Sequence, residues 1–174
     1  ERVLQAASVP VLMVRAQEEH AEDVQQLTLC RRILVPLDSS EMAEQVLSPV
    51  RSVAQAVGAE VFLFQVAVGQ PASIYLGDWL FLPAEGEFEE EKRKAQAYLE
   101  RVAGPLREGG IQVFTGTQIG PVAESIIEYA EANEIDLIAM CTHGRTGLAR
   151  WALGSVADRV LRAGGGPILL VRAR

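Results

Sequence analysis

A glycine-containing loop near the C-terminal end of the chain holds the residue types that bind an anion. Gly144 and Gly154 have no side chain, so the backbone at these positions can approach a bound group closely. A helix is expected to begin at Ser155, and the first N–H groups of a helix are unpaired donors that carry a partial positive charge. The Ser155 hydroxyl and the Arg145 guanidinium add further donors. The loop therefore has the chemistry of a phosphate-binding site.

Other chemistry in the same region has less support. The chain contains neither the Walker-type G-x-x-x-x-G-K-[ST] loop nor the G-x-G-x-x-G dinucleotide motif. His143 has no nucleophile at a recognisable spacing, so we expect it to anchor the loop rather than to act as a base. Cys141 follows an apolar run, and we expect it to behave as a small buried hydrophobe rather than as a redox thiol.

Strand and helix patterns alternate around this loop. Short apolar runs predict strands at residues 32–38, 60–68, 111–117, 136–141 and 168–171. Helical periodicity and capping residues predict helices at residues 42–57, 88–107, 121–132 and 155–163. Pro49 lies inside the first of these helices and is expected to kink it. The order predicts an α/β fold, with an open five-stranded parallel sheet that carries helices on both faces.

The ends of two predicted strands are the expected position of the site. In open parallel sheets, ligands bind beyond the carboxyl ends of the strands, where the strand order reverses. One predicted strand ends at Asp38 and another at Cys141, and each is followed by polar residues. Asp38 considered alone is more often a helix cap than a ligand contact. The nearby loop favours the ligand-binding interpretation.

The beginning of the chain repeats its end. ERVLQAASVPVLMVRA at residues 1–16 matches DRVLRAGGGPILLVRA at residues 158–173, at an offset of 157. Each copy has the pattern of a helix end, a turn at proline and a buried strand. We interpret residues 1–16 as the end of a preceding similar domain or as an extra N-terminal strand, residues 17–29 as a polar linker, and residues 30–174 as one domain.

Composition excludes several classes of partner. A formal charge of −7 and a pI near 4.9 argue against binding to nucleic acid or to anionic lipid. No apolar run approaches the roughly 20 residues that a membrane-spanning helix needs. Cys30 and Cys141 are far apart and suggest neither a disulfide framework nor a metal site, so a reducing cytoplasm is the expected compartment.

The loop resembles that of the universal stress protein family. The ATP-binding members carry G-x2-G-x9-G-[ST] after the fourth strand, and Gly144, Gly154 and Ser155 match the second half of this motif. Cys141 stands where the first glycine of the family would be. The likeness extends over residues 31–173, and its other matching segments are residues 35–40, 65–66, 120–124 and 167–172. It implies a Rossmann-like fold of the adenine nucleotide alpha hydrolase type.

The resemblance also implies a ligand and a binding site. The ligand would be an adenine nucleotide, ATP in the first instance, with Mg²⁺ or Mn²⁺ carried by its phosphates. Pro36 and Val66 would line the adenine pocket, and Asp38 would lie near the ribose or the metal ion. The phosphates would be held by the loop and by the following helix N-terminus. The full set of expected ligand-binding residues is Pro36, Asp38, Val66, Cys141, Gly144, Arg145, Gly154, Ser155 and Val156.

Partners and function follow as expectations from the same resemblance. The last strand of the family commonly pairs across a dimer or between tandem domains, so Ile168–Arg172 would pair with Pro10–Arg15 within the chain or between chains. The expected function is a nucleotide-dependent stress-response or signalling module, which is at most a slow ATPase. The alternative is a nucleotide-free assembly domain whose pocket is altered by Cys141. A nucleotidyl transferase or a flavoprotein subunit is a weaker third interpretation, and a missing H-x-G-H motif counts against the transferase.

Overall fold

The computed structural model describes residues 9–14, 30–67, 75–76, 79–80, 85–142, 154–164 and 166–172, with the backbone alone at 75–76, 79–80 and 85–87. Its strands are β1 (Val11–Met13), β2 (Arg32–Pro36), β3 (Glu60–Ala67), β4 (Tyr75–Leu76), β5 (Trp79–Leu80), β6 (Val113–Ile119), β7 (Leu137–Cys141) and β8 (Ile168–Val171). Its helices are α2 (Glu41–Glu44), α3 (Leu47–Val57), α4 (Glu85–Glu108), α5 (Val122–Ala132) and α6 (Ser155–Ala163). No helix among the described residues is long and apolar enough to cross a bilayer.

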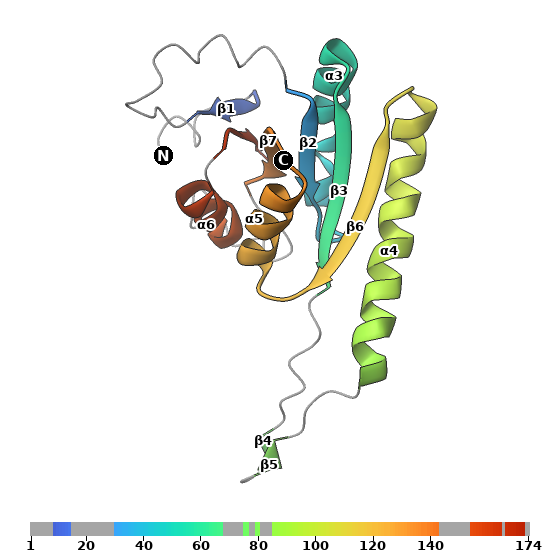
Figure 1. Cartoon of the computed structure of the whole chain (residues 1–174), viewed down its shortest axis with the longest axis vertical. Helices are drawn as coiled ribbons and strands as arrows, with labels where there is room; N and C mark the ends of the chain where they lie inside the picture. The colour runs from blue at the N-terminus through green and yellow to red at the C-terminus, as the bar shows by residue number, and fades with distance from the viewer. Residues whose placement is uncertain are drawn as a thin grey trace.

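The main sheet has the strand order β1-β8-β7-β2-β3-β6 (Figure 1). The neighbours from β8 to β6 all run parallel, and β1 is antiparallel to β8. The five-stranded parallel sheet and the extra N-terminal strand predicted from the sequence are therefore confirmed. Trp79 begins β5 of a short separate β4–β5 hairpin.

Alternation along the strands builds a hydrophobic core on each face of the sheet. In β2, Ile33 and Val35 pack on one face and Leu34 packs on the other, as the two-residue period of a strand requires. Residues of α3 and α4 complete the first core, and residues of α5 and α6 complete the second. Figure 1 shows these two pairs of helices on opposite sides of the sheet. The two faces are called the α3–α4 face and the α5–α6 face.

The first predicted helix is divided into two. Ser40 caps α2, because its hydroxyl oxygen accepts a 3.1 Å hydrogen bond from the Ala43 N–H. A turn at residues 45–46 separates α2 from α3, and Pro49 then lies in the first turn of α3, where a missing N–H is tolerated. Instead of a kink at Pro49, the helix is therefore interrupted at residues 45–46, shortly before the proline. Gly58, with a left-handed φ of 70°, ends α3.

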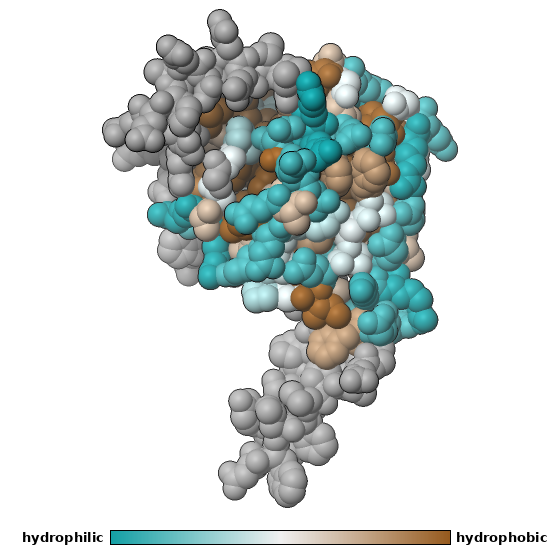
Figure 2. Space-filling model, viewed as in Figure 1, coloured by the Kyte–Doolittle hydropathy of each residue, from teal (hydrophilic) through white to brown (hydrophobic). Residues whose placement is uncertain are grey.

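The outer strands differ in how they are covered. Val11 and Met13 of β1 pack against the core of the α5–α6 face, whereas Leu12 is 50% exposed. On the opposite edge, Phe114 of β6 is 40% exposed and stacks on Phe62 with ring centroids 4.8 Å apart. Figure 2 shows hydrophilic residues over most of the visible face, with a small apolar area over β3 and β6.

Candidate functional site

A cavity of about 500 Å³ opens at the carboxyl ends of β2, β3 and β7. From β2 the chain continues to β3 on one side, whereas from β7 it continues to β8 on the other side. This reversal is the topological switch point at which open parallel sheets bind ligands. The volume suits a small molecule of nucleotide size.

Most of the residues predicted to bind the ligand lie around this cavity. Those that line it are Pro36, Asp38, Val66, Cys141, Gly154, Ser155 and Val156. Gly144 and Arg145 lie outside the described residues, as does His143. The structure thus brings together three strand ends and one helix N-terminus that are far apart in the sequence. Contacts of these residues with a ligand stay predictions.

The turn after β2 fixes the position of Asp38. Its Oδ1 accepts hydrogen bonds from the Ser40 N–H at 3.1 Å and from the Ser40 hydroxyl at 2.6 Å. Ser39 between them has a φ of 65°, a left-handed conformation that few residues other than glycine adopt. The Gln65 amide at the end of β3 donates to the Ser39 hydroxyl oxygen at 3.0 Å and holds this turn in place. Such strain is retained where the surroundings impose it, most often at functional sites.

The start of α6 supplies backbone donors to the other end of the cavity. The Gly154 N–H donates a 2.6 Å hydrogen bond to the Thr142 carbonyl oxygen, so α6 begins directly beside the end of β7. Gly154 is the N-cap of α6, and no side chain among the described residues caps that helix. The N–H groups of Ser155 and Val156 in the first turn have no partner within the helix, and both residues line the cavity at the favourable end of the helix dipole.

An ion pair ties the helix α6 to its neighbour α5. Arg159 of α6 pairs with Glu124 in the first turn of α5. Both helices begin at the same edge of the sheet, and Val122 and Ile126 of α5 line the cavity together with Val156. The pair lies at the surface and contributes little to stability, whereas the apolar residues of α5 form a wall of the cavity beside α6.

Cys141 is directed toward the α3–α4 face. Its Sγ lies 3.7 Å from the Ala43 carbonyl oxygen of α2, and the residue is 8% exposed. Burial raises the pKa of the Cys141 thiol to about 11, and burial together with the charge of Asp136 raises that of Cys30 to about 11 as well. Both thiols are therefore neutral near pH 7 and poor nucleophiles, as the sequence suggested for Cys141.

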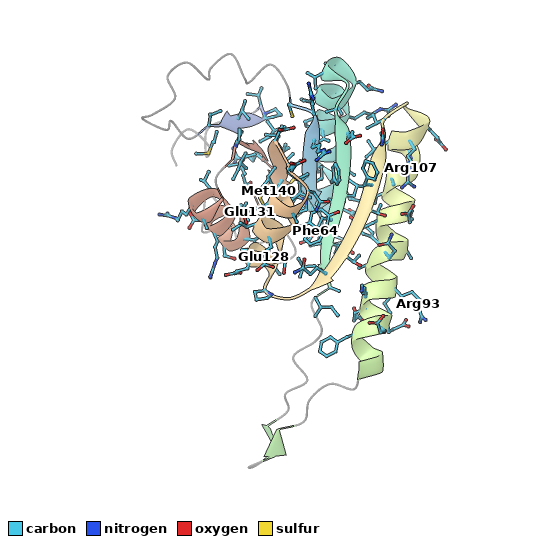
Figure 3. The ribbon with its side chains drawn as sticks, in the orientation of Figure 1. Phe64, Arg93, Arg107, Glu128, Glu131 and Met140 are labelled. Atoms are coloured by element: carbon cyan, nitrogen blue, oxygen red, sulfur yellow. The ribbon has the colours of Figure 1, made fainter. Side chains whose placement is uncertain are left out.

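Apolar side chains complete the wall on the α5–α6 face. Phe64 and Met140 lie beneath α5 (Figure 3) and line the cavity. Tyr129 of α5 stacks on Phe64 with ring centroids 4.2 Å apart. Gly116 of β6 leaves room for the Tyr129 ring, since a Cβ there would lie 2.6 Å from the Tyr129 oxygen. An apolar wall beside a polar helix N-terminus suits a ligand with a flat base and an anionic group.

Sequence reasoning missed the contribution of α4. Glu91, Lys94 and Ala95 line the cavity from this helix, and Ser39 and Gln65 line it beside them. Charged residues at the start of an amphipathic helix have the ordinary pattern of a solvated surface, so nothing in the sequence distinguished Glu91 or Lys94. Their role follows only from the packing of α4 next to β3.

Carboxylates of the cavity are compatible with a cation carried by a ligand. Asp38 and Glu91 are the acidic residues of the described lining. No cluster of three or more His, Cys, Asp or Glu side chains suited to a metal ion occurs in the described part of the chain. Mg²⁺ is commonly held by one or two carboxylates together with phosphate oxygens, and Asp38 fits that arrangement.

Comparison with known proteins defines the family. The universal stress protein family model matches residues 30–172, so the chain belongs to the universal stress protein family. Universal stress protein MJ0531 of Methanocaldococcus jannaschii is 35% identical over 148 residues, which cover 83% of this chain and 83% of that protein. Universal stress protein MJ0577 of the same organism is 30% identical over 155 residues, which cover 83% of this chain and 96% of that protein. The solved structure of MJ0577 is similar with a TM-score of 0.69 and 29% identity, over 83% of this chain and 97% of that one.

More distant matches differ in length and in bound ligand. A universal stress protein of Mycolicibacterium smegmatis is 28% identical, and the match covers 99% of this chain but 54% of that protein. A universal stress protein solved in complex with cAMP has a TM-score of 0.58 at 19% identity, over 82% of this chain and 96% of that one. A family protein from Arabidopsis thaliana solved with AMP bound has a TM-score of 0.58 at 13% identity, over 83% of this chain and 92% of that one. The last two likenesses concern the fold.

Proposed function

We propose that this chain binds ATP in the cavity at the carboxyl edge of its sheet and acts as a nucleotide-dependent stress-response or signalling module. The observation that carries the proposal is the juxtaposition of the uncapped N-terminus of α6 with the apolar wall at Val66. The first offers donors to phosphate, and the second offers a surface to a base. That two distant structural relatives were solved with AMP and with cAMP supports a nucleotide as the ligand class.

In this proposal, the parts of the nucleotide lie at different elements around the cavity. The phosphates would accept hydrogen bonds from the N–H groups at Ser155 and Val156, and from the Ser155 hydroxyl. The base would lie toward Pro36 and Val66, at the ends of β2 and β3. Asp38 between them would face the ribose, or a Mg²⁺ or Mn²⁺ ion that neutralises phosphate charge.

Binding rather than rapid catalysis is the proposed role. Among the described residues that line the cavity there is no histidine, and the Cys141 thiol is neutral near pH 7 because burial raises its pKa to about 11. Hydrolysis of ATP needs a positioned water or base and charge stabilisation at the γ-phosphate. We therefore propose that occupancy of the site, with at most slow hydrolysis, carries the signal. Two unpaired thiols are compatible with the cytoplasm as the proposed compartment.

The nucleotide-free alternative receives less support from the position of Cys141. Its sulfur is packed between the end of β7 and α2, and the side chain is accommodated in the core of the α3–α4 face. The cavity remains open beside it, at about 500 Å³. The ATP-binding interpretation is therefore the one that we retain.

We further propose that residues 1–16 end a preceding domain of the same fold. β1 and β8 pair Val11 with Leu170, Leu12 with Leu169 and Met13 with Ile168. When each residue is replaced by its equivalent in the other copy, at the offset of 157, the first and the third pair exchange places and the pair Leu12–Leu169 stays the same. Such a register is expected of two equivalent strands around a local two-fold axis. The Mycolicibacterium smegmatis relative, which this chain covers by about half, has the length for two such domains.

Titration calorimetry with Mg-ATP tests the nucleotide proposal. We expect saturable binding with one nucleotide per chain. Native mass spectrometry of the protein taken from cells is expected to show a retained mass that matches ATP. Absence of heat at millimolar Mg-ATP, together with an unliganded native mass, would reject ATP as the ligand.

A further inference from the structure

Two oppositely charged side chains of α4 lie together at the rim of the cavity. Lys94 Nζ lies 2.9 Å from Glu91 Oε1 and 3.9 Å from Glu90 Oε1. Within the described part of the chain, Lys94 is the one cationic residue that lines the cavity. The Lys94 and Glu91 side chains are 60% and 41% exposed, so both can reach a molecule in the cavity.

This pair faces the end of the cavity that is remote from the α6 N-terminus. The helix α6 follows β7, whereas α4 packs next to β3 and β6, and β2 lies between β7 and β3. Adjacent strands are about 4.8 Å apart, so the ends of β7 and β3 are separated by roughly 10 Å. A nucleotide whose phosphates lie at the start of α6 would therefore place its base toward Glu91 and Lys94.

The chemistry of the pair distinguishes one purine from the other. A carboxylate only accepts hydrogen bonds and an ammonium only donates them. The N6/N7 edge of adenine offers one donor and one acceptor, whereas the O6/N7 edge of guanine offers two acceptors. A carboxylate opposite position 6 would be hydrogen-bonded by adenine and repelled by guanine. An ion pair this exposed contributes little to folding stability, so both side chains can exchange partners when a ligand arrives.

We propose that Glu91 reads the edge of the base and selects adenine over guanine, with Lys94 beside it. Glu91 accepts a hydrogen bond from the 6-amino group, whereas Lys94 donates one to N7, an acceptor that both purines share. This specificity rests on the proposed nucleotide function and adds to it the residue that sets base preference. Arg93, on the same helix, points away from the sheet (Figure 3) and pairs with Glu90, so it takes no part.

Competition between nucleotides in the full chain tests this proposal. Dissociation constants for ATP, GTP and AMP would be measured by calorimetry for the unchanged protein and for Glu91→Gln and Lys94→Met. Glu89→Gln and Lys92→Met are matched controls, because both residues are exposed on α4 and outside the described lining of the cavity. A circular dichroism melt of each variant checks that α4 is intact.

We expect the unchanged protein to bind ATP roughly tenfold more tightly than GTP, because one matched hydrogen-bonding edge of a base gives discrimination of about this size. Glu91→Gln should reduce this preference by about threefold or more. Lys94→Met should weaken the binding of both nucleotides without reducing the preference, and both controls should keep it. The ratio of AMP to ATP affinity should stay constant in every variant, since the phosphates lie at the other end. A Glu91→Gln variant with an unchanged base preference, or with a changed AMP to ATP ratio alone, would overturn the assignment. Loss of all nucleotide binding by the unchanged protein would instead reject the proposed function itself.

Discussion

The Cys141 thiol lies 3.7 Å from the carbonyl oxygen of Ala43, and this contact joins the end of β7 to α2. The sulfur belongs to the core of the α3–α4 face, while the backbone of the same residue borders the cavity. The residue that replaces the first glycine of the family motif therefore has two separable effects. One concerns the stability of the fold and the other concerns the approach of a ligand.

Replacement of Cys141 by glycine separates these effects. We expect Cys141→Gly to lower the free energy of unfolding by about 1–2 kcal/mol, because a buried side chain is lost and glycine is unfavourable in a strand. We expect its affinity for ATP to stay within about threefold of that of the unchanged protein, because the side chain that is lost is packed in the core of the α3–α4 face. Urea unfolding and calorimetry measure the two quantities. Cys141→Ser keeps the Cβ and should likewise keep the affinity; a large gain in affinity for the glycine variant alone would show that the Cβ obstructs the ligand.

Both thiols should resist modification until the protein unfolds. Burial raises the pKa of Cys30 and of Cys141 from the usual 9.0 to about 11 in the folded state. Alkylation by iodoacetamide at about pH 8 should therefore be slow, and urea should make it fast. Intact-mass measurement counts the labelled thiols. Rapid labelling of the folded protein would contradict the burial of Cys141 and the partial burial of Cys30.

The same pKa values predict a loss of stability at alkaline pH. The folded state retains the two protons to higher pH than the unfolded state does. Their contribution to stability is thus fully present below pH 9 and is lost as the pH rises through about 11. A double variant, Cys30→Ser with Cys141→Ser, should lose less stability between these pH values in urea titrations.

Gly154 should be replaceable without unfolding but not without loss of ligand. Its φ of −59° and ψ of 151° are accessible to any L-residue, so Gly154→Val should remain folded, although valine is a poor N-cap and should cost about 1 kcal/mol of stability. The valine side chain would lie where the phosphates are expected, and ATP affinity should fall by roughly tenfold or more. Unchanged affinity in calorimetry would remove the α6 N-terminus from the proposed site.

Gly116 should tolerate no side chain. A Cβ there would lie 2.6 Å from the Tyr129 oxygen, and Tyr129 cannot retreat because it is stacked on Phe64. Gly116→Ala should therefore cost about 1–3 kcal/mol of stability in urea unfolding. Gly104→Ala is the control: no atom outside its chain neighbours and its own helix lies within 4 Å of its Cβ position. The stability should change by less than about 1 kcal/mol, because the helix propensity of alanine is offset by crowding with Pro105. Equal stabilities of the two variants would argue against the aromatic stack.

Removal of residues 1–29 should change the oligomeric state. β1 now pairs with the outer edge of β8, and the self-symmetric register allows β8 of a second chain to take the place of β1. We expect the shortened protein to form a dimer in analytical ultracentrifugation, with Leu169 of each chain at the two-fold axis. A shortened protein that stays monomeric at high concentration would contradict this use of the edge.

Local patterns predicted most of the fold. The predicted helix 155–163 and strand 168–171 agree with α6 and β8. An apolar run or a helical period can be recognised in the sequence whatever the element packs against. Other boundaries moved by a few residues: the strand predicted at 111–117 is β6, Val113–Ile119. At Pro49, local chemistry predicted a disturbance, and only the packed structure shows it to be a break before the proline.

The candidate site was less accessible to sequence reasoning. Gly154 and Ser155 could be found because donors at a helix start need particular residue types. Glu91 and Lys94 could not, since their position depends on where α4 packs relative to β3. The left-handed φ of Ser39 could not be foreseen either. It depends on the hydrogen bond that Asp38 accepts within the turn and on the one that Gln65 donates from the neighbouring strand β3.

The hydrogen bond between Gly154 and Thr142 also bears on how such a domain can diverge. It is made by main-chain atoms alone and joins the end of β7 to the start of α6. The junction therefore makes no demand on the chemistry of the Thr142 side chain. Conservative substitutions at Thr142, which lines the cavity, can change the site while β7 and α6 keep their places.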